Sequence, residues 1–334
     1  MAPALSWLSA CKSSQLKAVA TATGINSSGI KPVLISQLLN HLPNGYLRHG
    51  RTKSASEDPY DIISIDMGIR NLAYCRLTSP QPLTAAKSSL PPRIASPVIS
   101  EWARVEISNK ASKLAGAEGS ETKEAFDPAT YSQHAYDLVK TLLLRSPRKP
   151  TDILIERQRF RSMGGSAVQE WTLRVNMFEA MIYAVLKTLS EHGTWQGMVH
   201  PIAPAKVSKF WLGEREGAAV EGGGSKSAKT KTAKINLVGT WLKERDAEDH
   251  PFRLMGEAET LGMAYLRKRN RGKKVLAKHE VMDGEEGNAV VPVAIGKLDD
   301  LADCMLQGMA WIRWEQNRKL IVSKGLEALD EIGT

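Results

Sequence analysis

The stretch DIISIDMGIRNLAYCRL, residues 61–77, decides the fold of this chain. Two apolar runs rich in strand-forming residues flank the turn-like MGIRN, and this pattern predicts a β-hairpin. The first run ends in a single carboxylate, Asp66. An acid at a strand end is by default a turn residue, so a functional role for Asp66 depends on whether the chain supplies other acids that meet it.

Outward from this hairpin, strands and helices alternate. We expect a third strand at 97–107 and, after a loop at 108–127, further elements of both kinds. These are an amphipathic helix at 128–146, a buried strand at 152–160, a long helix at 166–193, a strand at 197–204, a helical stretch within 251–274 and a last helix at 296–322. The Gly- and Lys-rich segment 213–234 is expected to be a flexible basic loop. A hairpin followed by alternating elements predicts an α/β fold in which a mixed sheet is flanked by helices.

The N-terminal region differs from the rest of the chain. Residues 5–42 predict two short helices, with Gly24 ending the first and Pro32 in the first turn of the second. Residues 1–56 contain no Asp or Glu and are rich in Ser. This composition suits either a mitochondrial targeting segment or a small basic module that binds nucleic acid. We expect three parts: a helical module at 1–45, a linker at 46–60 and a large domain at 61–325.

Composition narrows the classes of function. The chain has 334 residues, 42% hydrophobic residues and a net charge of +9, which suits a polyanionic partner such as nucleic acid. No apolar run is long enough for a transmembrane helix, so no membrane partner is expected. The three cysteines, Cys11, Cys75 and Cys304, form no CxxC pair, and the histidines show no metal-binding spacing. A disulfide framework or a zinc site is therefore not expected. We expect the protein to reside in a reducing intracellular compartment.

Other carboxylates sit where they can meet Asp66. Glu156 ends the strand DILIE, and Asp299, Asp300 and Asp303 open the last helix. Acids three or four residues apart share a helix face, and here that face also carries Leu306 and Gln307. Oxygen ligands from several elements are what Mg²⁺ needs, and two such ions can clamp the attacking and leaving oxygens of a phosphodiester. A helix N-terminus also favours acids through its dipole, which is the ordinary explanation for Asp299 and Asp300.

The motifs IDMGIRNLAY, ILIERQRFR and GKLDDLADCMLQGMAW, in this order, resemble the fungal mitochondrial Holliday-junction resolvases. These are cruciform-cutting endonucleases of the RuvC-like, RNase H-type fold, and the resemblance covers roughly residues 60–320. The segment LSACKSSQLKAVATATGINSSGIKPVLISQLLNHL is similar to a SAP-type helical module that binds DNA. The resemblance implies an RNase H-like catalytic domain preceded by a small helical SAP-like module.

The resemblance also implies a reaction and a site. It implies a metal-dependent, structure-selective endonuclease of the mitochondrial matrix that resolves four-way DNA junctions as a homodimer by paired symmetric cuts. Mg²⁺ is the implied cofactor, replaceable by Mn²⁺, with two ions in each active site. Asp66, Glu156 and Asp303 match the catalytic and metal-binding acids of the family. The remaining place stays open between Asp299 and Asp300, with Asp299 preferred.

Basic residues near these acids are candidates for binding phosphates. One group flanks the proposed acids in sequence, and the other lies in or beside the Gly-rich segment: Arg70, Arg157, Arg159, Arg161, Lys226, Lys229, Lys231 and Lys234. Binding through such residues predicts an affinity that falls steeply with salt. Phe160, Trp171 and Tyr136 are candidates for stacking on a base, although most aromatic side chains of this kind are core residues.

Two other functions remain open from the sequence. The first is a non-catalytic RNA-binding protein of the same fold, because the superfamily also resembles a mitochondrial intron-splicing factor. The second is an architectural DNA-binding protein in which the N-terminal module carries the affinity. The retained acids favour an active enzyme over both.

Overall fold

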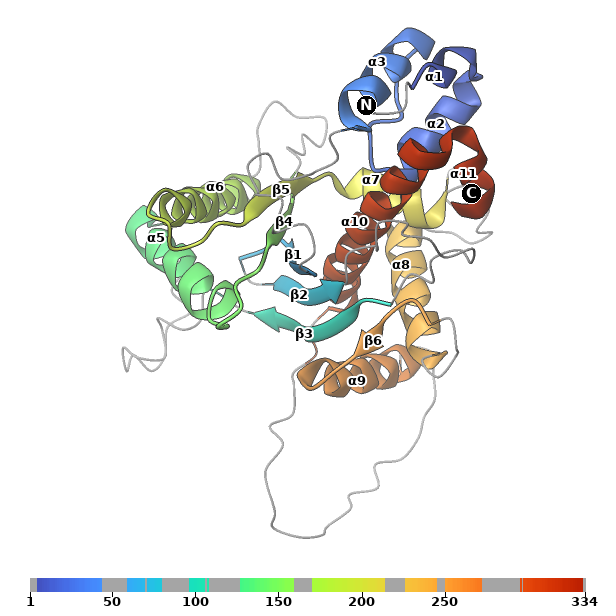
Figure 1. Ribbon diagram of the computed structural model, residues 1–334. Helices are drawn as coiled ribbons and strands as arrows, with labels where there is room; N and C mark the ends of the chain where they lie inside the picture. The colour runs from blue at the N-terminus through green and yellow to red at the C-terminus, as the bar shows by residue number, and fades with distance from the viewer. Residues whose placement is uncertain are drawn as a thin grey trace, which may run out of the picture.

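The structure is a computed structural model (Figure 1). It describes residues 5–43, 59–69, 71–79, 96–105, 107, 127–158, 170–213, 226–244, 250–271, 295 and 297–332.

A six-stranded mixed sheet forms the centre, with the strand order β5-β4-β1-β2-β3-β6. Its strands are β1 (Tyr60–Asp66), β2 (Leu72–Ser79), β3 (Val98–Val105), β4 (Asp152–Glu156), β5 (Met198–Ile202) and β6 (Arg253–Leu254). The first three form an antiparallel meander, and β4 and β5 add in parallel on the other side of β1. This is the mixed sheet that the sequence predicts, and it makes β1 and β4 neighbours.

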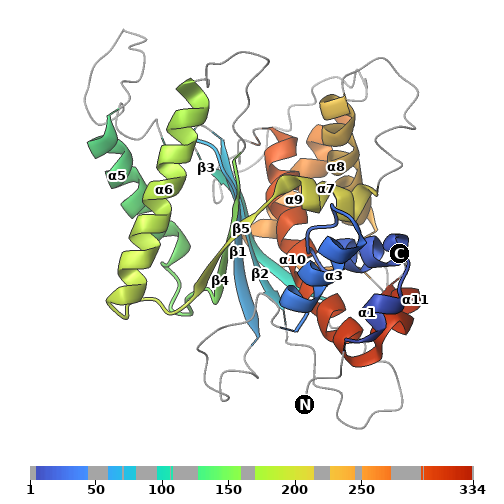
Figure 2. The ribbon, with the colours of Figure 1, turned by 90° about the horizontal axis from the view of Figure 1, so that it is seen from above.

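Helices cover both faces of the sheet (Figure 2). One face is covered by α5 (Pro128–Asp137), which continues into a π-helical turn at Leu138–Leu143, and by α6 (Glu170–Glu191). The other face carries α7 (Pro204–Leu212), α8 (Lys226–Lys243), α9 (Glu257–Arg271) and α10 (Leu298–Lys324). The α/β fold with helices on both faces is thus confirmed.

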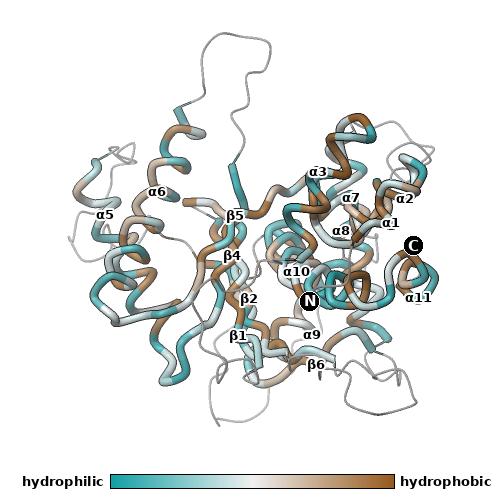
Figure 3. Tube along the Cα trace, turned by 45° about the horizontal axis from the view of Figure 1, so that its top comes forward, coloured by the Kyte–Doolittle hydropathy of each residue, from teal (hydrophilic) through white to brown (hydrophobic). Residues whose placement is uncertain are grey.

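Alternation along the strands produces two cores. Ile63 and Ile155 pack toward α5 and α6, whereas Ile62 and Leu154 pack toward α10. All four side chains are buried. Figure 3 shows the hydrophobic colouring along the central strands. Because successive residues of a strand point to opposite faces, Asp66 lies on the same face as Ile62, which is the face that α10 covers.

The axis of the second core is α10. Its residues Leu301, Met305 and Met309, which the sequence predicts as core, are all buried. Gly308 lets this helix approach the sheet closely, since a Cβ there would lie 2.5 Å from Leu77 Cδ1. Such a close approach fixes the distance between α10 and the strands that carry Asp66 and Glu156.

A small helical module packs on the far end of α10. It consists of α1 (Trp7–Ala10), α2 (Ser13–Ala22) and α3 (Lys31–His41), and it shares a core with Ile321 of α10 and Ala328 of α11 (Ala328–Ile332). Figure 1 shows these helices gathered around the C-terminal segment. A short 3₁₀ turn, Gly325–Glu327, joins α10 to α11.

Gly24 lies where the N-terminal module packs against Trp314 of α10. Its replacement by Ala is expected to destabilise the fold. Its φ is +67°, and a Cβ would lie 2.5 Å from Cε3 of Trp314. The positive φ costs a non-glycine residue about 1–2 kcal/mol, and the overlap adds about 1–3 kcal/mol. Denaturant unfolding of Gly24→Ala should therefore show a loss of about 2–5 kcal/mol.

Gly256→Ala is the matched control, because its φ is +59° and nothing lies within 4 Å of its Cβ position. It should show the backbone cost alone. Equal losses in the two variants would mean that the Trp314 contact contributes nothing.

Three expectations about local structure are wrong. Lys226–Lys243 is the helix α8, whereas the sequence analysis placed 213–234 in a loop. The Gly run at 222–224 dominated that prediction, but Val238 and Leu242 lie one helical turn apart and bury against α10's core. The predicted strand at 197–204 ends earlier, because Pro204 begins α7. The first predicted helix is two helices, α1 and α2, since Lys12 is an extended N-cap.

Candidate active site

Three acids from three elements converge at one edge of the sheet. Asp66 ends β1, Glu156 ends β4, and Asp303 lies in the second turn of α10. One carboxylate oxygen of each lies within 4.8 Å of the others. The register explains the pairing of the first two, because Ile65 is opposite Ile155 in the parallel ladder. Among the described residues, this is the one group of three such side chains with metal-binding spacing.

The other two acids of α10 have different partners. Asp299 Oδ2 forms an ion pair with Lys231 Nζ at 2.6 Å. Asp300 Oδ2 lies 3.8 Å from Arg104 Nε, which is too long for a hydrogen bond. This oxygen is buried, and no donor within the described residues hydrogen-bonds to it.

Crowding of these acids shifts their protonation. Burial raises the pKa of Asp66 well above its ordinary value, and the charges of Glu156, Asp303 and Asp300 raise it further. Burial also raises the pKa of Asp303, against the opposing charge of Lys234. For Asp299, burial acts to raise the pKa, but the hydrogen bond and charge of Lys231 outweigh it and lower the pKa. The cluster therefore requires positive charge or protons.

The residues present fit a hard divalent cation. The donors are carboxylate oxygens, which Mg²⁺ and Mn²⁺ prefer. The buried Asp300 oxygen and the raised pKa of Asp66 indicate a concentration of negative charge that a bound cation would neutralise. Divalent metal use is therefore supported, whereas the identity and number of the ions belong to the proposal below.

A cleft of about 940 Å³ opens over the acids. Glu156 and Asp303 line it together with five cationic residues: Arg157, Lys209, Lys231, Lys234 and Lys297. Lys234 is the most buried of these five cationic residues, with a side chain that is 10% exposed. Its Nζ lies 2.7 Å from Asp303 Oδ1. A concave, cationic surface over an acidic floor matches an extended phosphodiester chain.

The structure brings only part of the predicted basic set to this cleft. Arg157, Lys231 and Lys234 line it, and Lys229 lies on the same helix, α8. Lys226 begins α8. Arg70, Arg159 and Arg161 lie outside the described residues.

The aromatic candidates separate in the same way. Trp171 lines the cleft and is 44% exposed, so it can reach a base there. Tyr136 is 40% exposed on α5, where its hydroxyl accepts from Lys140 Nζ at 3.0 Å, and it is not part of the cleft lining. Phe160 lies outside the described residues.

Four polar residues of the site were not predicted to be functional from the sequence. Lys209 and Lys297 line the cleft, and Gln158 lines it while donating to the Met67 carbonyl at 3.4 Å. Gln307 lies beneath the acids and is buried. Helical spacing already placed Gln307 on the face of the acids, but no sequence signal pointed to α7, which carries Lys209.

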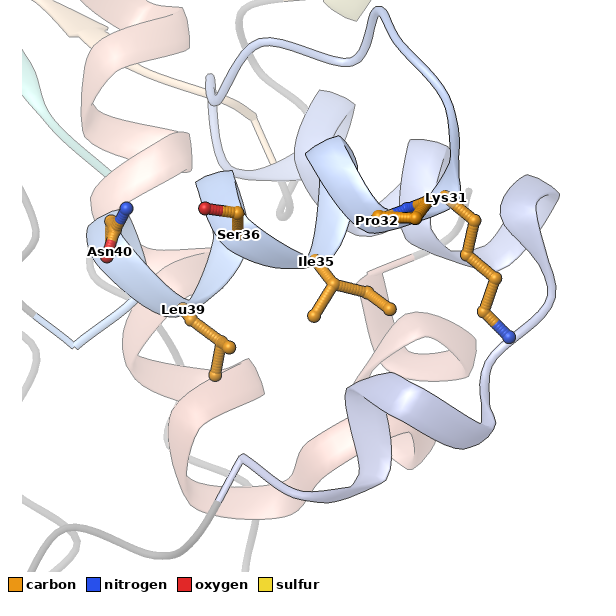
Figure 4. Close-up of a pocket in the computed structure, with 6 residues that line it drawn as sticks. All are labelled: Lys31, Pro32, Ile35, Ser36, Leu39 and Asn40. Atoms are coloured by element: carbon orange, nitrogen blue, oxygen red, sulfur yellow. The ribbon is translucent and has the colours of Figure 1, made fainter.

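A second hollow lies along α3, well apart in the chain from the acids. It is lined by Lys31, Pro32, Ile35, Ser36, Leu39 and Asn40 (Figure 4). These side chains include no carboxylate, thiol or imidazole, so the hollow has no catalytic chemistry of its own.

Metal binding at the acids is expected to strengthen as the pH rises through 6. Burial, followed by the charge of Asp299, raises the pKa of Asp300 to about 6. The pKa values of Asp66 and Asp303 are raised as well. Protons compete with the metal for these oxygens. Each time the pH is lowered by one unit, the apparent Mn²⁺ affinity should therefore fall by up to about tenfold for each proton that the metal displaces. Calorimetric titration at several pH values measures this, and a pH-independent affinity would contradict it.

Comparisons with known proteins agree with this geometry. A family model described as mitochondrial resolvase Ydc2 and RNA splicing MRS1 matches residues 62–321. The mitochondrial cruciform cutting endonuclease 1 of Schizosaccharomyces pombe is 23% identical over 312 residues, covering 92% of this chain and 94% of the relative. Its Saccharomyces cerevisiae namesake is 24% identical over 322 residues, covering 93% and 84%.

The fold also has a solved counterpart. The crystal structure of the yeast mitochondrial Holliday junction resolvase Ydc2 superposes with a TM-score of 0.54 at 22% identity, covering 96% of this chain and 98% of that one. The match supports the fold of the whole chain. Together with the family match, it confirms the resemblance inferred from the motifs: this chain belongs to the family of the mitochondrial resolvase Ydc2 and the RNA-splicing protein MRS1.

Proposed function

We propose that this protein is a metal-dependent endonuclease that resolves four-way DNA junctions in mitochondria. The observation that carries the proposal is the convergence of Asp66, Glu156 and Asp303 under a cationic cleft. Both curated relatives are named mitochondrial cruciform cutting endonucleases, which supports the reaction, the substrate and the location.

Asp66, Glu156 and Asp303 would hold Mg²⁺, or Mn²⁺ in its place. Asp300 is a candidate fourth ligand beside Asp299, because its buried Oδ2 has no hydrogen-bond donor within the described residues and only a 3.8 Å ion pair with Arg104, whereas Lys231 holds Asp299 at 2.6 Å. When bound, two ions would supply the charge that stabilises the attacking and leaving oxygens of a phosphodiester. The preference for Asp299 that the sequence suggests stays a prediction beside this candidate.

Cationic side chains of this chain would contact the phosphates of the substrate. Lys234 approaches Asp303 from α8, so its ammonium group lies within reach of a phosphate held over the acids. Arg157 follows Glu156 directly, and its backbone N–H donates to the Ile202 carbonyl at 2.8 Å, which ties the end of β4 to the end of β5. Lys209 and Lys297 extend the positive surface along the cleft. These residues would bind and orient the phosphate chain.

The SAP-like identity of α1–α3 remains a prediction. The second predicted helix is observed as α3, whereas the first is divided into α1 and α2, and the module contains Lys12, Lys17 and Lys31 but no carboxylate. These features support a DNA-binding role. Within the described residues, no helix is long and apolar enough to cross a membrane.

A homodimer is proposed through the outer face of α6. Leu173 is 49% exposed, and Met177, Ala180 and Ala184 follow it at spacings of four, three and four residues. This is the spacing of a helix seam that packs against a second helix. Such a dimer would place two active sites on one junction, as paired cutting requires.

Leu173→Glu is expected to convert the dimer into a monomer, because it places a charge without a partner in the packed seam, at its most exposed large apolar side chain. Light scattering after size-exclusion chromatography measures the mass. Leu39→Glu is the matched control, since Leu39 is 45% exposed on α3, and it should leave the dimer intact. A dimeric Leu173→Glu protein would place the interface elsewhere.

A supercoiled plasmid with a cruciform-forming inverted repeat tests the function. With Mg²⁺, paired cuts across the cruciform should linearise it, while the same plasmid without the repeat stays supercoiled. An RNA-binding relative without catalysis is the second candidate, because the family description includes an RNA-splicing member. Intact cruciform plasmid together with selective binding of structured RNA would favour that alternative.

A further inference from the structure

A buried amide lies directly beneath the acids. Gln307 of α10 is 2% exposed and comes one helical turn after Asp303. Its Nε2 lies 3.1 Å from Ser64 Oγ, 3.1 Å from the Ile65 carbonyl and 3.4 Å from the Leu154 carbonyl. One side chain thus contacts both central strands.

These acceptors are next to the acids in sequence. Ile65 precedes Asp66 in β1, and Leu154 lies two residues before Glu156 in β4. The donor itself shares a helix face with Asp303. Gln307 therefore links the three elements that deliver the three carboxylates.

The orientation of this amide is fixed by its partners. Backbone carbonyl oxygens only accept hydrogen bonds, so the NH₂ group of Gln307 must face Ile65 and Leu154. Replacement by an apolar side chain would leave these contacts unmade at a buried position, and a carboxylate would face two carbonyl oxygens without a donor.

Apolar packing does not supply the same constraint. Contacts around Gly308, Leu77 and Met305 hold α10 against the sheet, but dispersion and burial are non-directional. They set how far the helix lies from the strands. Directional hydrogen bonds set its rotation and its translation along the sheet, and a shift of α10 moves Asp303 relative to Asp66 and Glu156.

We infer that Gln307 is a positioning residue that sets the distance between Asp303 and the two strand-end acids. The inference rests on the proposed metal-dependent function, because a metal site is what demands that distance. Groups that orient metal ligands typically change metal affinity or activity by about 10–100-fold when they are removed.

The test is Mn²⁺ binding by Gln307→Met in the full-length protein without DNA, followed through the paramagnetic resonance signal of free Mn²⁺. Methionine keeps the length of the side chain and removes its donors. The dissociation constant should rise by about tenfold or more. Junction cleavage by this variant should show a lower kcat, while its junction affinity changes by less than about twofold.

Gln316→Met is the matched control, because Gln316 is 6% exposed and lies on the same helix, next to Asn317, whose Nδ2 donates to the Ala22 carbonyl at 2.8 Å. It should bind Mn²⁺ like the wild type. Gln307→Asn keeps the amide on a shorter stem, and its Mn²⁺ affinity should fall between those of the wild type and Gln307→Met. It serves as the deciding variant if Gln307→Met does not fold.

Two results would overturn the inference. One is wild-type Mn²⁺ affinity in the folded Gln307 variants. The other is an equal loss in Gln316→Met, which would assign the effect to general loosening of α10. A wild-type protein that binds Mn²⁺ but cuts no junction would defeat the proposed function alone, since the Mn²⁺ affinities are compared without any reaction.

Discussion

Asp66→Asn should reduce junction cleavage by about a thousandfold or more while junction binding stays intact. Asp66 lies at the centre of the acidic cluster, where its pKa is raised by burial and by three neighbouring carboxylates. Loss of a proposed metal ligand would remove several kcal/mol of transition-state stabilisation, and about 4 kcal/mol corresponds to a thousandfold in rate. Single-turnover cleavage and gel-shift binding measure the two effects separately.

The same variant should stabilise the metal-free protein. The pKa of Asp66 is higher in the folded protein than in the unfolded chain. At a pH above the folded-state pKa, ionisation of Asp66 therefore lowers the free energy of unfolding. This destabilisation decreases as the pH falls and is gone below the pKa that Asp66 has in the unfolded chain. At neutral pH with chelator, Asp66→Asn should therefore melt at a higher temperature than the wild type. Mg²⁺ should raise the melting temperature of the wild type more than that of the variant.

Asp137→Asn is the control for this experiment, because Asp137 is exposed on α5 and accepts from Gln133 Nε2 at 3.0 Å. It should cut junctions at the wild-type rate. Cleavage by Asp66→Asn at a rate near that of the wild type would remove Asp66 from the catalytic site.

Lys234→Met should lower cleavage by about a hundredfold with little change in junction affinity. Lys234 is nearly buried, and its Nζ lies 2.7 Å from Asp303 Oδ1. A cation aimed at a position where negative charge develops is typically worth about a hundredfold to a thousandfold in rate. Mn²⁺ affinity should not weaken, because the variant removes a cation that competes with the metal for Asp303.

Lys243→Met is the matched control on the same helix, since Lys243 lies in the last turn of α8 and does not line the cleft. Wild-type cleavage by Lys234→Met would leave Lys234 with a structural role only. A loss of junction binding as large as the loss of rate would make it a general phosphate contact.

The fold was largely predictable because its signals are local. A short stretch of sequence is enough to predict each of three elements: the hairpin at 61–77, the strand before Glu156 and the apolar stripe of α10. The order of these elements then restricts the sheet. Once β1 and β4 are parallel neighbours, Asp66 and Glu156 must end at the same edge.

The site was predictable where an acid, or a basic or aromatic residue near the acids or in the Gly-rich segment, marked it. Lys234 was expected in a loop, and the structure places it on a helix beside Asp303, because burial of Val238 and Leu242 outweighs the nearby glycines. Lys209 carries no local signal, and helical spacing places Gln307 on the face of the acids without indicating its partners, since these lie far away in the chain, as between Gln307 and Leu154. The preference between Asp299 and Asp300 likewise depends on Lys231 and Arg104, which helical spacing alone does not place.

The most direct measurement is the mapping of cuts on a synthetic four-way junction whose two opposing strands carry different labels. In Mg²⁺, the wild-type protein should nick both strands at symmetric positions near the crossover, with no nicks in chelator or on a matched linear duplex. Tight binding of the junction without any cut in Mg²⁺ or Mn²⁺ would contradict the account, and would leave the acids of this cleft without a catalytic role.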